Sequence, residues 1–136
     1  MLTLKPVDIE YLEQYDDLLR SVFQVIQHDL DESGYEEGEI TRSKRPILAS
    51  SDVLGWFTRE DKLVSQLSVY PCKVNIHGRI YQMGGLTGVG TYPEYAGMGL
   101  MNDLIRVALE RMRARKQWIS YLYPSSVPYY RTKGWE

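Results

Sequence analysis

The stretch from residue 84 to residue 104 constrains this chain more than any other, and it reads GGLTGVGTYPEYAGMGLMNDL. A glycine-punctuated strand is broken at Pro93, and a turn containing Gly97 and Gly99 leads directly into an amphipathic helix. Because these glycines leave the turn without side-chain bulk, the free N–H groups of the first helical turn can face an anion, which the positive end of the helix dipole also favours. The sequence therefore predicts a cradle for a phosphorylated ligand.

Two common nucleotide-binding motifs do not fit this stretch. Gly85, Gly88 and Gly90 have the wrong spacing for a GxGxxG fingerprint, and no Lys followed by Ser or Thr completes a phosphate-binding loop. The pattern that does fit is a strand, a proline and a short glycine-bearing turn whose amides contact a pyrophosphate at a helix N-terminus.

Hydrophobic periodicity predicts an alternation of strands and helices along the chain. A short strand at residues 2–5 is followed by a helix that Asp8 caps and that ends near His28. Residues 29–52 are first acidic, then basic and interrupted by Pro46, so we expect an irregular segment with at most a short helix. Three antiparallel strands, a helix, a strand and a last short helix follow at residues 53–58, 63–76, 80–91, from about 99, 118–123 and 126–133.

The composition indicates one soluble globular domain. The chain has 136 residues, 43% of them hydrophobic and 25% charged, which is enough apolar material for a single core. Its net charge of −2 gives no general attraction to nucleic acid or to an anionic membrane, and no apolar stretch approaches the ~20 residues that span a bilayer. A single cysteine excludes an internal disulfide and no secretion signal is visible, so we expect a cytoplasmic protein without nucleic-acid or membrane partners.

Two segments resemble a known family. The segment VGTYPEYAGMGLMNDLIRVALERM resembles motif A of the GNAT superfamily of N-acetyltransferases, and SYLYPSSVPYYRTKGWE is similar to the corresponding segment of its Eis (enhanced intracellular survival) branch. The resemblance implies the GNAT acyl-CoA N-acyltransferase fold, of class α/β (α+β), with a mixed central sheet and flanking helices. It also implies that residues 1–136 form a single N-terminal GNAT domain, a piece of a longer chain that lacks the C-terminal strands of the fold.

The resemblance implies that acetyl-CoA is the cosubstrate and that main-chain groups hold it. In the family the turn starts with Arg or Gln and closes with Gly or Ala, whereas Ala96 and Met101 stand here, so one side-chain contact to phosphate is lost and the backbone donors stay. Val89 also fits a core strand position, and Ser125 and Ser126 fit helix caps equally well. The expected coenzyme contacts are Val89, Gly90 and Thr91 at the strand end, Gly97, Met98, Gly99, Leu100, Met101 and Asn102 in the turn, and Ser125 and Ser126.

Tyr130 is the candidate for proton transfer. When an amine attacks a thioester, a thiolate leaves, and a phenol with a pKa of ~10 is matched to protonate a sulfur of comparable basicity. By resemblance, the tyrosine four residues before the position of Gly134 is the general acid in Eis-like enzymes. Tyr129 and Tyr130, beside Trp135, also fit a role in packing, since the chain has 11 tyrosines.

The sequence thus predicts an acetyl-CoA-dependent N-acetyltransferase that acts by direct attack of a primary amine. The resemblance implies an aminoglycoside, polyamine or lysine-like acceptor, and a homo-oligomer in the longer form. A noncatalytic acyl-CoA-binding or assembly module is the alternative, favoured by Ala96 and by a general base that the resemblance places at the C-terminus of a longer chain. No metal is expected, because His28 and His77 lack Cys or His partners.

Overall fold

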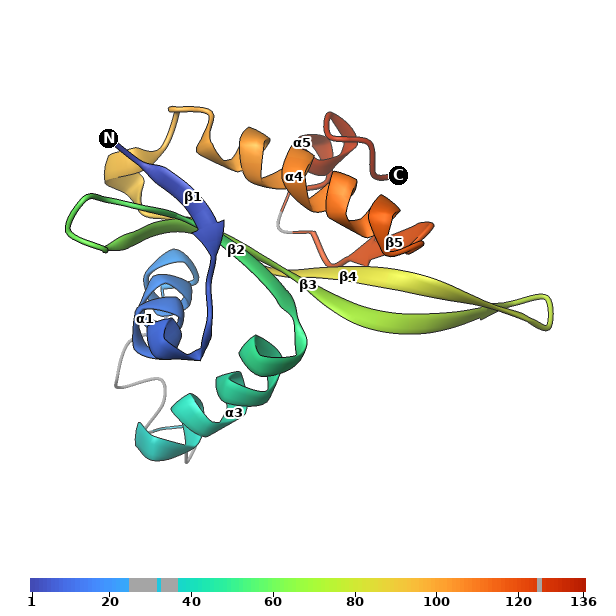
Figure 1. Cartoon of the computed structure of the whole chain (residues 1–136), viewed down its shortest axis with the longest axis horizontal. Coiled ribbons are helices and arrows are strands. Elements are labelled where there is room, and N and C mark those ends of the chain that lie inside the picture. The colour runs from blue at the N-terminus through green and yellow to red at the C-terminus, as the bar shows by residue number, and fades with distance from the viewer. Residues whose placement is uncertain (25–31, 33–36, 125) are drawn as a thin grey trace.

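The computed structural model describes residues 1–24, 32, 37–124 and 126–136 (Figure 1). Its elements follow the order predicted from periodicity, with one additional helix before the second strand. They are β1 Thr3–Pro6, a 3₁₀ turn Ile9–Tyr11, α1 Leu12–Val22, α3 Glu37–Ser50, β2 Asp52–Phe57, β3 Leu63–Ile76, β4 Arg79–Thr91, a 3₁₀ turn Pro93–Tyr95, α4 Leu100–Ala114, β5 Ile119–Leu122 and α5 Val127–Arg131.

The strands form one mixed sheet in the order β1-β2-β3-β4-β5. Neighbours from β1 to β4 are antiparallel, whereas β5 follows α4 and pairs parallel to β4. The long strands β3 and β4 extend together as a hairpin beyond the rest of the sheet (Figure 1). The predicted α/β class, with a mixed central sheet and flanking helices, is therefore confirmed.

Helices cover both faces of the sheet, and each face has its own apolar core. α1 and α3 lie on one face, and α4 and α5 lie on the other (Figure 1). Tyr15 and Leu18 of α1 are buried in the first core, and Leu104 and Met112 of α4 are buried in the second. Within the described residues, no helix combines the length and the apolar character needed to cross a membrane.

An ion-pair cluster ties the C-terminal end of α4 to the start of β2. Arg111 Nε lies 2.6 Å from the Asp52 carboxylate, and Arg115 Nη1 lies 2.5 Å from it. Burial raises the pKa of Asp52, but hydrogen bonds from the two arginines outweigh it and hold that pKa below its usual value. The cluster fixes how α4 crosses the sheet, and thereby where its N-terminus lies.

The segment before β2 is more helical than its sequence predicts. We expected an irregular segment at residues 29–52, but α3 spans Glu37–Ser50 and contains Pro46. Proline removes one hydrogen bond from a helix interior, which weakens the local preference. Leu48 is only 3% exposed and packs in the core of the α1 face, so burial of this helix offsets its weak propensity. The prediction of irregular structure is wrong for residues 37–50.

Asp8 caps a helical segment as predicted, but that segment starts as the 3₁₀ turn Ile9–Tyr11 before α1 begins at Leu12, and α1 ends earlier than predicted. The Asp8 carboxylate accepts a hydrogen bond from the Glu10 N–H at 3.0 Å, as a cap does. α1 ends at Val22, and Gln24 adopts a left-handed conformation with φ of 53°, which stops the helix. The predicted end near His28 is therefore wrong, and His28 itself lies outside the described residues.

β4 contains a bulge near its C-terminal end. Between Thr87 and Gly90 it gains one residue relative to β3. Gly88 lies in this bulge with φ of 61°, a conformation that favours glycine. It also has no room for a side chain, because a Cβ there would lie 2.5 Å from the Tyr15 hydroxyl oxygen and 3.0 Å from the Ser68 hydroxyl oxygen. Those two hydroxyls are hydrogen-bonded to each other at 2.8 Å, so they form a fixed wall behind the bulge.

β4 and β5 part just before this bulge. Their parallel pairing runs from Met83–Ile119 to Leu86–Leu122, while β4 continues to Thr91. The sheet is therefore open between the two strands beyond Leu122.

Gly88→Ala is expected to destabilise the protein more than Gly78→Ala. Both positions have positive φ, 61° and 83°, so both substitutions carry backbone strain of about 1–2 kcal/mol. A Cβ at Gly78 meets no atom within 4 Å, whereas a Cβ at Gly88 meets the buried Tyr15. We expect Gly88→Ala to lose about 1–3 kcal/mol more in the free energy of unfolding, measured by urea denaturation. Equal losses for the two variants would contradict the wall behind the bulge.

Candidate active site

The turn between β4 and α4 is built on two left-handed glycines. Gly97 has φ of 77°, and Gly99, the N-cap of α4, has φ of 75°. A Cβ at either position would meet no atom within 4 Å. The backbone conformation, and not crowding within the protein, therefore requires glycine here, and the space in front of the turn is open to a ligand.

The N–H groups of this turn find no acceptor among the residues that the structure describes. No hydrogen bond within the described part of the chain uses the main-chain N–H of any residue from Gly97 to Asn102. The start of α4 is nevertheless held in place, because the Trp56 Nε1 group donates to the Leu100 carbonyl oxygen at 2.9 Å. A row of unpartnered donors at the positive end of a helix has the geometry that favours an anion.

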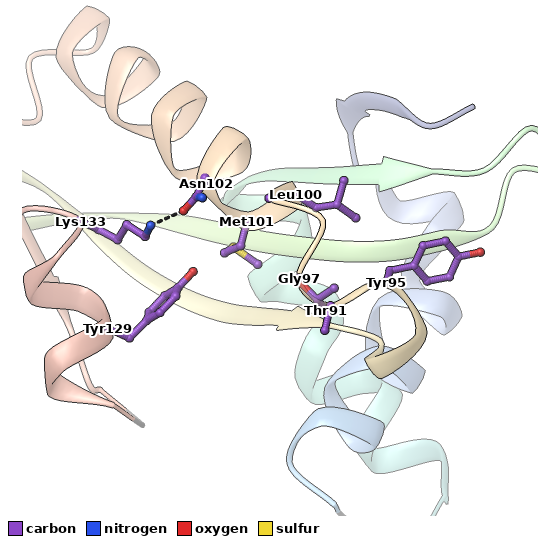
Figure 2. A pocket seen from close by; sticks show the side chains of 10 residues that line it. Thr91, Tyr95, Gly97, Leu100, Met101, Asn102, Tyr129 and Lys133 are labelled. Carbon is purple, nitrogen blue, oxygen red and sulfur yellow. Dashed lines mark hydrogen bonds between the residues drawn. The ribbon is translucent and has the colours of Figure 1, made fainter.

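A cavity of about 330 Å³ lies against this turn (Figure 2). Thr91, Tyr95 and residues of the turn line one side, and Tyr129 and Lys133 from the C-terminal segment line the other. The Lys133 ammonium group donates a hydrogen bond to the Asn102 side-chain oxygen and lies 5.4 Å from the centre of the Tyr129 ring. This arrangement directs a positive charge toward the N-terminus of α4.

The contribution of Lys133 was not predicted. Among the described residues that line this cavity, Lys133 carries the one formal charge. Lys133 is far from the turn in sequence, and only the fold brings the two together. The sequence pattern therefore carries little information that would have predicted Lys133 as a residue of this site. Its ammonium group supplies a cation at a site where Ala96 replaces the usual Arg or Gln. The turn therefore offers an anion one side-chain cation besides its main-chain donors.

A second cavity, of about 390 Å³, lies where β4 and β5 part. It is lined by Val22 and Phe23 at the end of α1, residues 86–89 of β4, Leu122 and Tyr123 at the end of β5, and Tyr130 of α5. Val22 packs against the core of the α1 face, whereas Leu86, Leu122 and Tyr130 belong to the core of the α4 face. The cavity therefore connects the two faces of the sheet through its opening.

Tyr130 is buried beside that opening. It is 8% exposed, and its ring makes edge contacts with the rings of Tyr129 at 5.1 Å and Trp135 at 6.2 Å between centroids. Burial, and secondarily the neighbouring Tyr129, raise the pKa of the Tyr130 phenol above its ordinary value. The phenol therefore keeps its proton over the whole neutral pH range, which is the form that a general acid needs.

The three residues expected at the end of β4 point to different surroundings. Thr91 lines the first cavity, and its hydroxyl lies 2.7 Å from that of Ser65. Val89 lines the second cavity and packs against the core of the α4 face, as a core strand residue does. Gly90 faces α1, and a Cβ there would lie 2.8 Å from a methyl carbon of Leu18. Close packing against α1 accounts for glycine at this position.

The other residues that the sequence predicts as coenzyme contacts lie in different places. Leu100, Met101 and Asn102 line the first cavity together with the two glycines of the turn. Met98 is 58% exposed at the tip of the turn. The Ser126 hydroxyl caps α5 by accepting a hydrogen bond from the Tyr129 N–H at 3.4 Å. Ser125 lies outside the described residues. Within the described residues, no group of three or more His, Cys, Asp or Glu side chains could hold a metal ion.

Solved structures share this fold. A conserved Enterococcus faecalis protein described as a probable N-acyltransferase is 28% identical, with a TM-score of 0.87 over 100% of this chain and 32% of its own. A GCN5-related N-acetyltransferase from Kribbella flavida is 26% identical, with a TM-score of 0.79 over 98% of this chain and 32% of its own. The present chain thus spans about a third of the length of these two relatives.

A protein from Clostridium acetobutylicum described as a predicted acetyltransferase, solved with acetyl-CoA, has a TM-score of 0.77 over 100% of this chain and 90% of its own. It is 15% identical, so this likeness shows the fold alone. None of the curated proteins matches the chain. The model of the acetyltransferase (GNAT) domain family matches residues 3–136. With that match, and with the mixed sheet and the glycine turn described above, the chain belongs to the GNAT family of acetyltransferases.

Proposed function

We propose that this chain transfers an acetyl group from acetyl-CoA to a primary amine by direct attack. One observation carries the proposal: the row of unpartnered N–H groups at the start of α4 adjoins an opening in the sheet that a buried tyrosine lines. Neighbouring residues connect the two places, because Thr91 and Tyr129 line the first cavity while Val89 and Tyr130 line the second. Diphosphate and thioester would therefore be held by one continuous surface.

Main-chain donors and one lysine would hold the diphosphate. The N–H groups from Gly97 to Asn102 lie in the turn and in the first residues of α4, and the Lys133 ammonium group adds a positive charge beside Asn102. The bulge at Gly88 and Val89 leaves main-chain groups of β4 outside the ladder with β3. An N–H there would stabilise the negative charge that develops on a thioester carbonyl oxygen.

Acetyl-CoA would supply a thioester carbon that a neutral amine attacks, so that a C–N bond forms, the C–S bond breaks and its electron pair leaves on sulfur. Tyr130 would give its phenolic proton to that sulfur, and the attacking nitrogen would release a proton to solvent, from which the Tyr130 phenolate would be protonated again. No covalent bond to the protein is needed in this scheme. The chain's part in the reaction is to orient the thioester and the amine, to polarise the thioester carbonyl and to move one proton.

A noncatalytic acyl-CoA-binding or assembly module is the second candidate. Ala96 favours it, because it removes a side-chain contact that the family usually makes with phosphate. The two candidates make the same prediction for coenzyme binding and opposite predictions for turnover.

Resemblance to the Eis-like branch supports further proposals on the setting of the reaction. It favours an aminoglycoside, polyamine or lysine-like amine, and a homo-oligomer in a longer form of the protein. The single cysteine, Cys72, favours a reducing compartment, so we propose the cytoplasm.

Tyr130→Phe is expected to lower kcat for amine acetylation about 100-fold while leaving the calorimetric Kd for acetyl-CoA within about twofold. The substitution keeps the ring that packs against Tyr129 and Trp135 and removes only the acid. Tyr70→Phe, on the β3–β4 hairpin, is the matched control, because Tyr70 lines neither cavity.

Since burial raises the pKa of Tyr130, the acid-dependent rate of the wild type should show no fall below about pH 10. Unchanged turnover in Tyr130→Phe would remove this residue from its role, and coenzyme binding without turnover in the wild type would favour the noncatalytic module.

Lys133→Ala is expected to weaken coenzyme A binding about fivefold at low salt, equivalent to about 1 kcal/mol, and by less at high salt. Pantetheine, which lacks the diphosphate, should bind the variant and the wild type alike. Arg131→Ala is the matched control, since Arg131 lies on α5 and lines neither of the two cavities described above. An equal loss for Arg131→Ala, or an equal loss of pantetheine affinity, would contradict a contact between Lys133 and the diphosphate.

A further inference from the structure

A group of buried polar side chains lies beside the bulge of β4. Apart from tyrosines, the buried polar and charged residues in the described part of the chain are Asp16 on α1 and Ser65, Gln66 and Ser68 on β3. The three on β3 pair with the bulged segment of β4, since their partners there are Thr91, Gly90 and Thr87. Polar groups are costly to remove from water, and they fix a single arrangement when their hydrogen bonds are made. We therefore looked for what this cluster holds in place.

Tyr15 of α1 contacts β3 on both sides of the bulge. Its hydroxyl is hydrogen-bonded to that of Ser68 at 2.8 Å, and its carbonyl oxygen accepts a hydrogen bond from the Gln66 side-chain amide at 3.2 Å. The pairing of β3 with β4 shifts register between Gln66 and Ser68. Tyr15 is 1% exposed and Ser68 is 0% exposed, so solvent does not compete for the bond between their hydroxyls. One residue of α1 is thus bonded to both strand positions that flank the register shift.

α1 also packs directly against the backbone of the bulged segment. A Cβ on Gly88 would lie 2.5 Å from the Tyr15 hydroxyl oxygen. A Cβ on Gly90 would lie 2.8 Å from methyl carbons of Leu18 and Val22. The two glycines therefore allow α1 a closer approach to β4 than side chains would. A phenylalanine at position 15 would fill almost the same space as the tyrosine, so packing alone does not account for the pair of hydroxyls.

We propose that Tyr15 and Ser68 are positioning residues, whose hydrogen-bonded hydroxyls hold the bulge of β4 in the shape that polarises the thioester carbonyl. The inference rests on the proposed function and assigns part of it to two side chains that line neither of the cavities described above. Gly88 and Val89 themselves line the second cavity, so a shift of the bulge toward α1 would withdraw their main-chain groups from it. Donors stabilise a developing charge best when they are held in place beforehand, so loss of the support should lower the rate more than the affinity.

The first experiment compares rates and affinities. Tyr15→Phe keeps the ring and removes its hydroxyl, and we expect kcat for amine acetylation to fall about tenfold while KM for the amine and Kd for acetyl-CoA stay within about twofold. Ser68→Ala removes the other hydroxyl and should have the same effect. The double variant should lose no more than either single variant, because all three lack the same hydrogen bond. Rates are expressed per acetyl-CoA site counted by calorimetry, so that unfolded protein does not lower them.

Tyr11→Phe is the matched control for the loss of a hydroxyl. Tyr11 lies just before α1 and donates a hydrogen bond to the Asp61 carboxylate at 2.8 Å, but it lines neither cavity. Its kcat should equal that of the wild type. An unchanged kcat in Tyr15→Phe or Ser68→Ala, or losses that multiply in the double variant, would overturn the inference and leave the proposed function intact.

The second experiment observes the carbonyl group itself. Infrared difference spectra are recorded with acetyl-CoA that carries ¹³C at the thioester carbonyl. A hydrogen bond weakens the C=O bond, so we expect the stretching frequency of the bound thioester to be higher in Tyr15→Phe and Ser68→Ala than in the wild type and Tyr11→Phe. A loss of stability alone would not change that frequency, and equal frequencies in every protein would overturn the inference. Binding of acetyl-CoA without turnover in the wild type would count against the proposed function, and the infrared comparison would then decide the inference alone.

Discussion

The main-chain N–H groups from Gly97 to Asn102 have no acceptor in the described part of the chain, and the rest of the site is arranged around them. Such donors need a partner, which is water in the free protein and an anion in the proposed complex. The fold keeps them in place through remote contacts: Trp56 holds the first carbonyl of α4, and Arg111 and Arg115 hold its far end on Asp52. The parting of β4 from β5 then leaves an opening next to this fixed turn.

Much of the fold could be predicted from local pattern. Glycine and proline mark the turn before α4, alternation marks the strands, and a four-residue spacing that includes Leu100, Leu104 and Ala108 marks the buried face of α4. Each of these signals comes from residues that are near one another in sequence. The N–H donors of the turn could also be predicted from the local sequence, because main-chain groups do not depend on side-chain identity. The structure places these residues where the pattern predicts them.

The parts that could not be predicted depend on contacts between distant segments. α3 forms across Pro46 because Leu48 is buried against the α1 face, a gain that no local propensity contains. Lys133 lines the first cavity because the C-terminal segment reaches the turn that follows β4. Phe23 lines the second cavity because the end of α1 reaches β4. Sequence spacing alone gives no measure of those approaches, so the lining of both cavities had to come from the structure.

The most direct test of the account is a nuclear magnetic resonance titration of the ¹⁵N-labelled chain with coenzyme A. The account predicts that the largest shifts of amide signals occur at Gly97 to Asn102, because their N–H groups gain phosphate acceptors, while the hairpin at residues 73–80 changes little. Saturable binding that leaves the amide signals of Gly97 to Asn102 unmoved would contradict it.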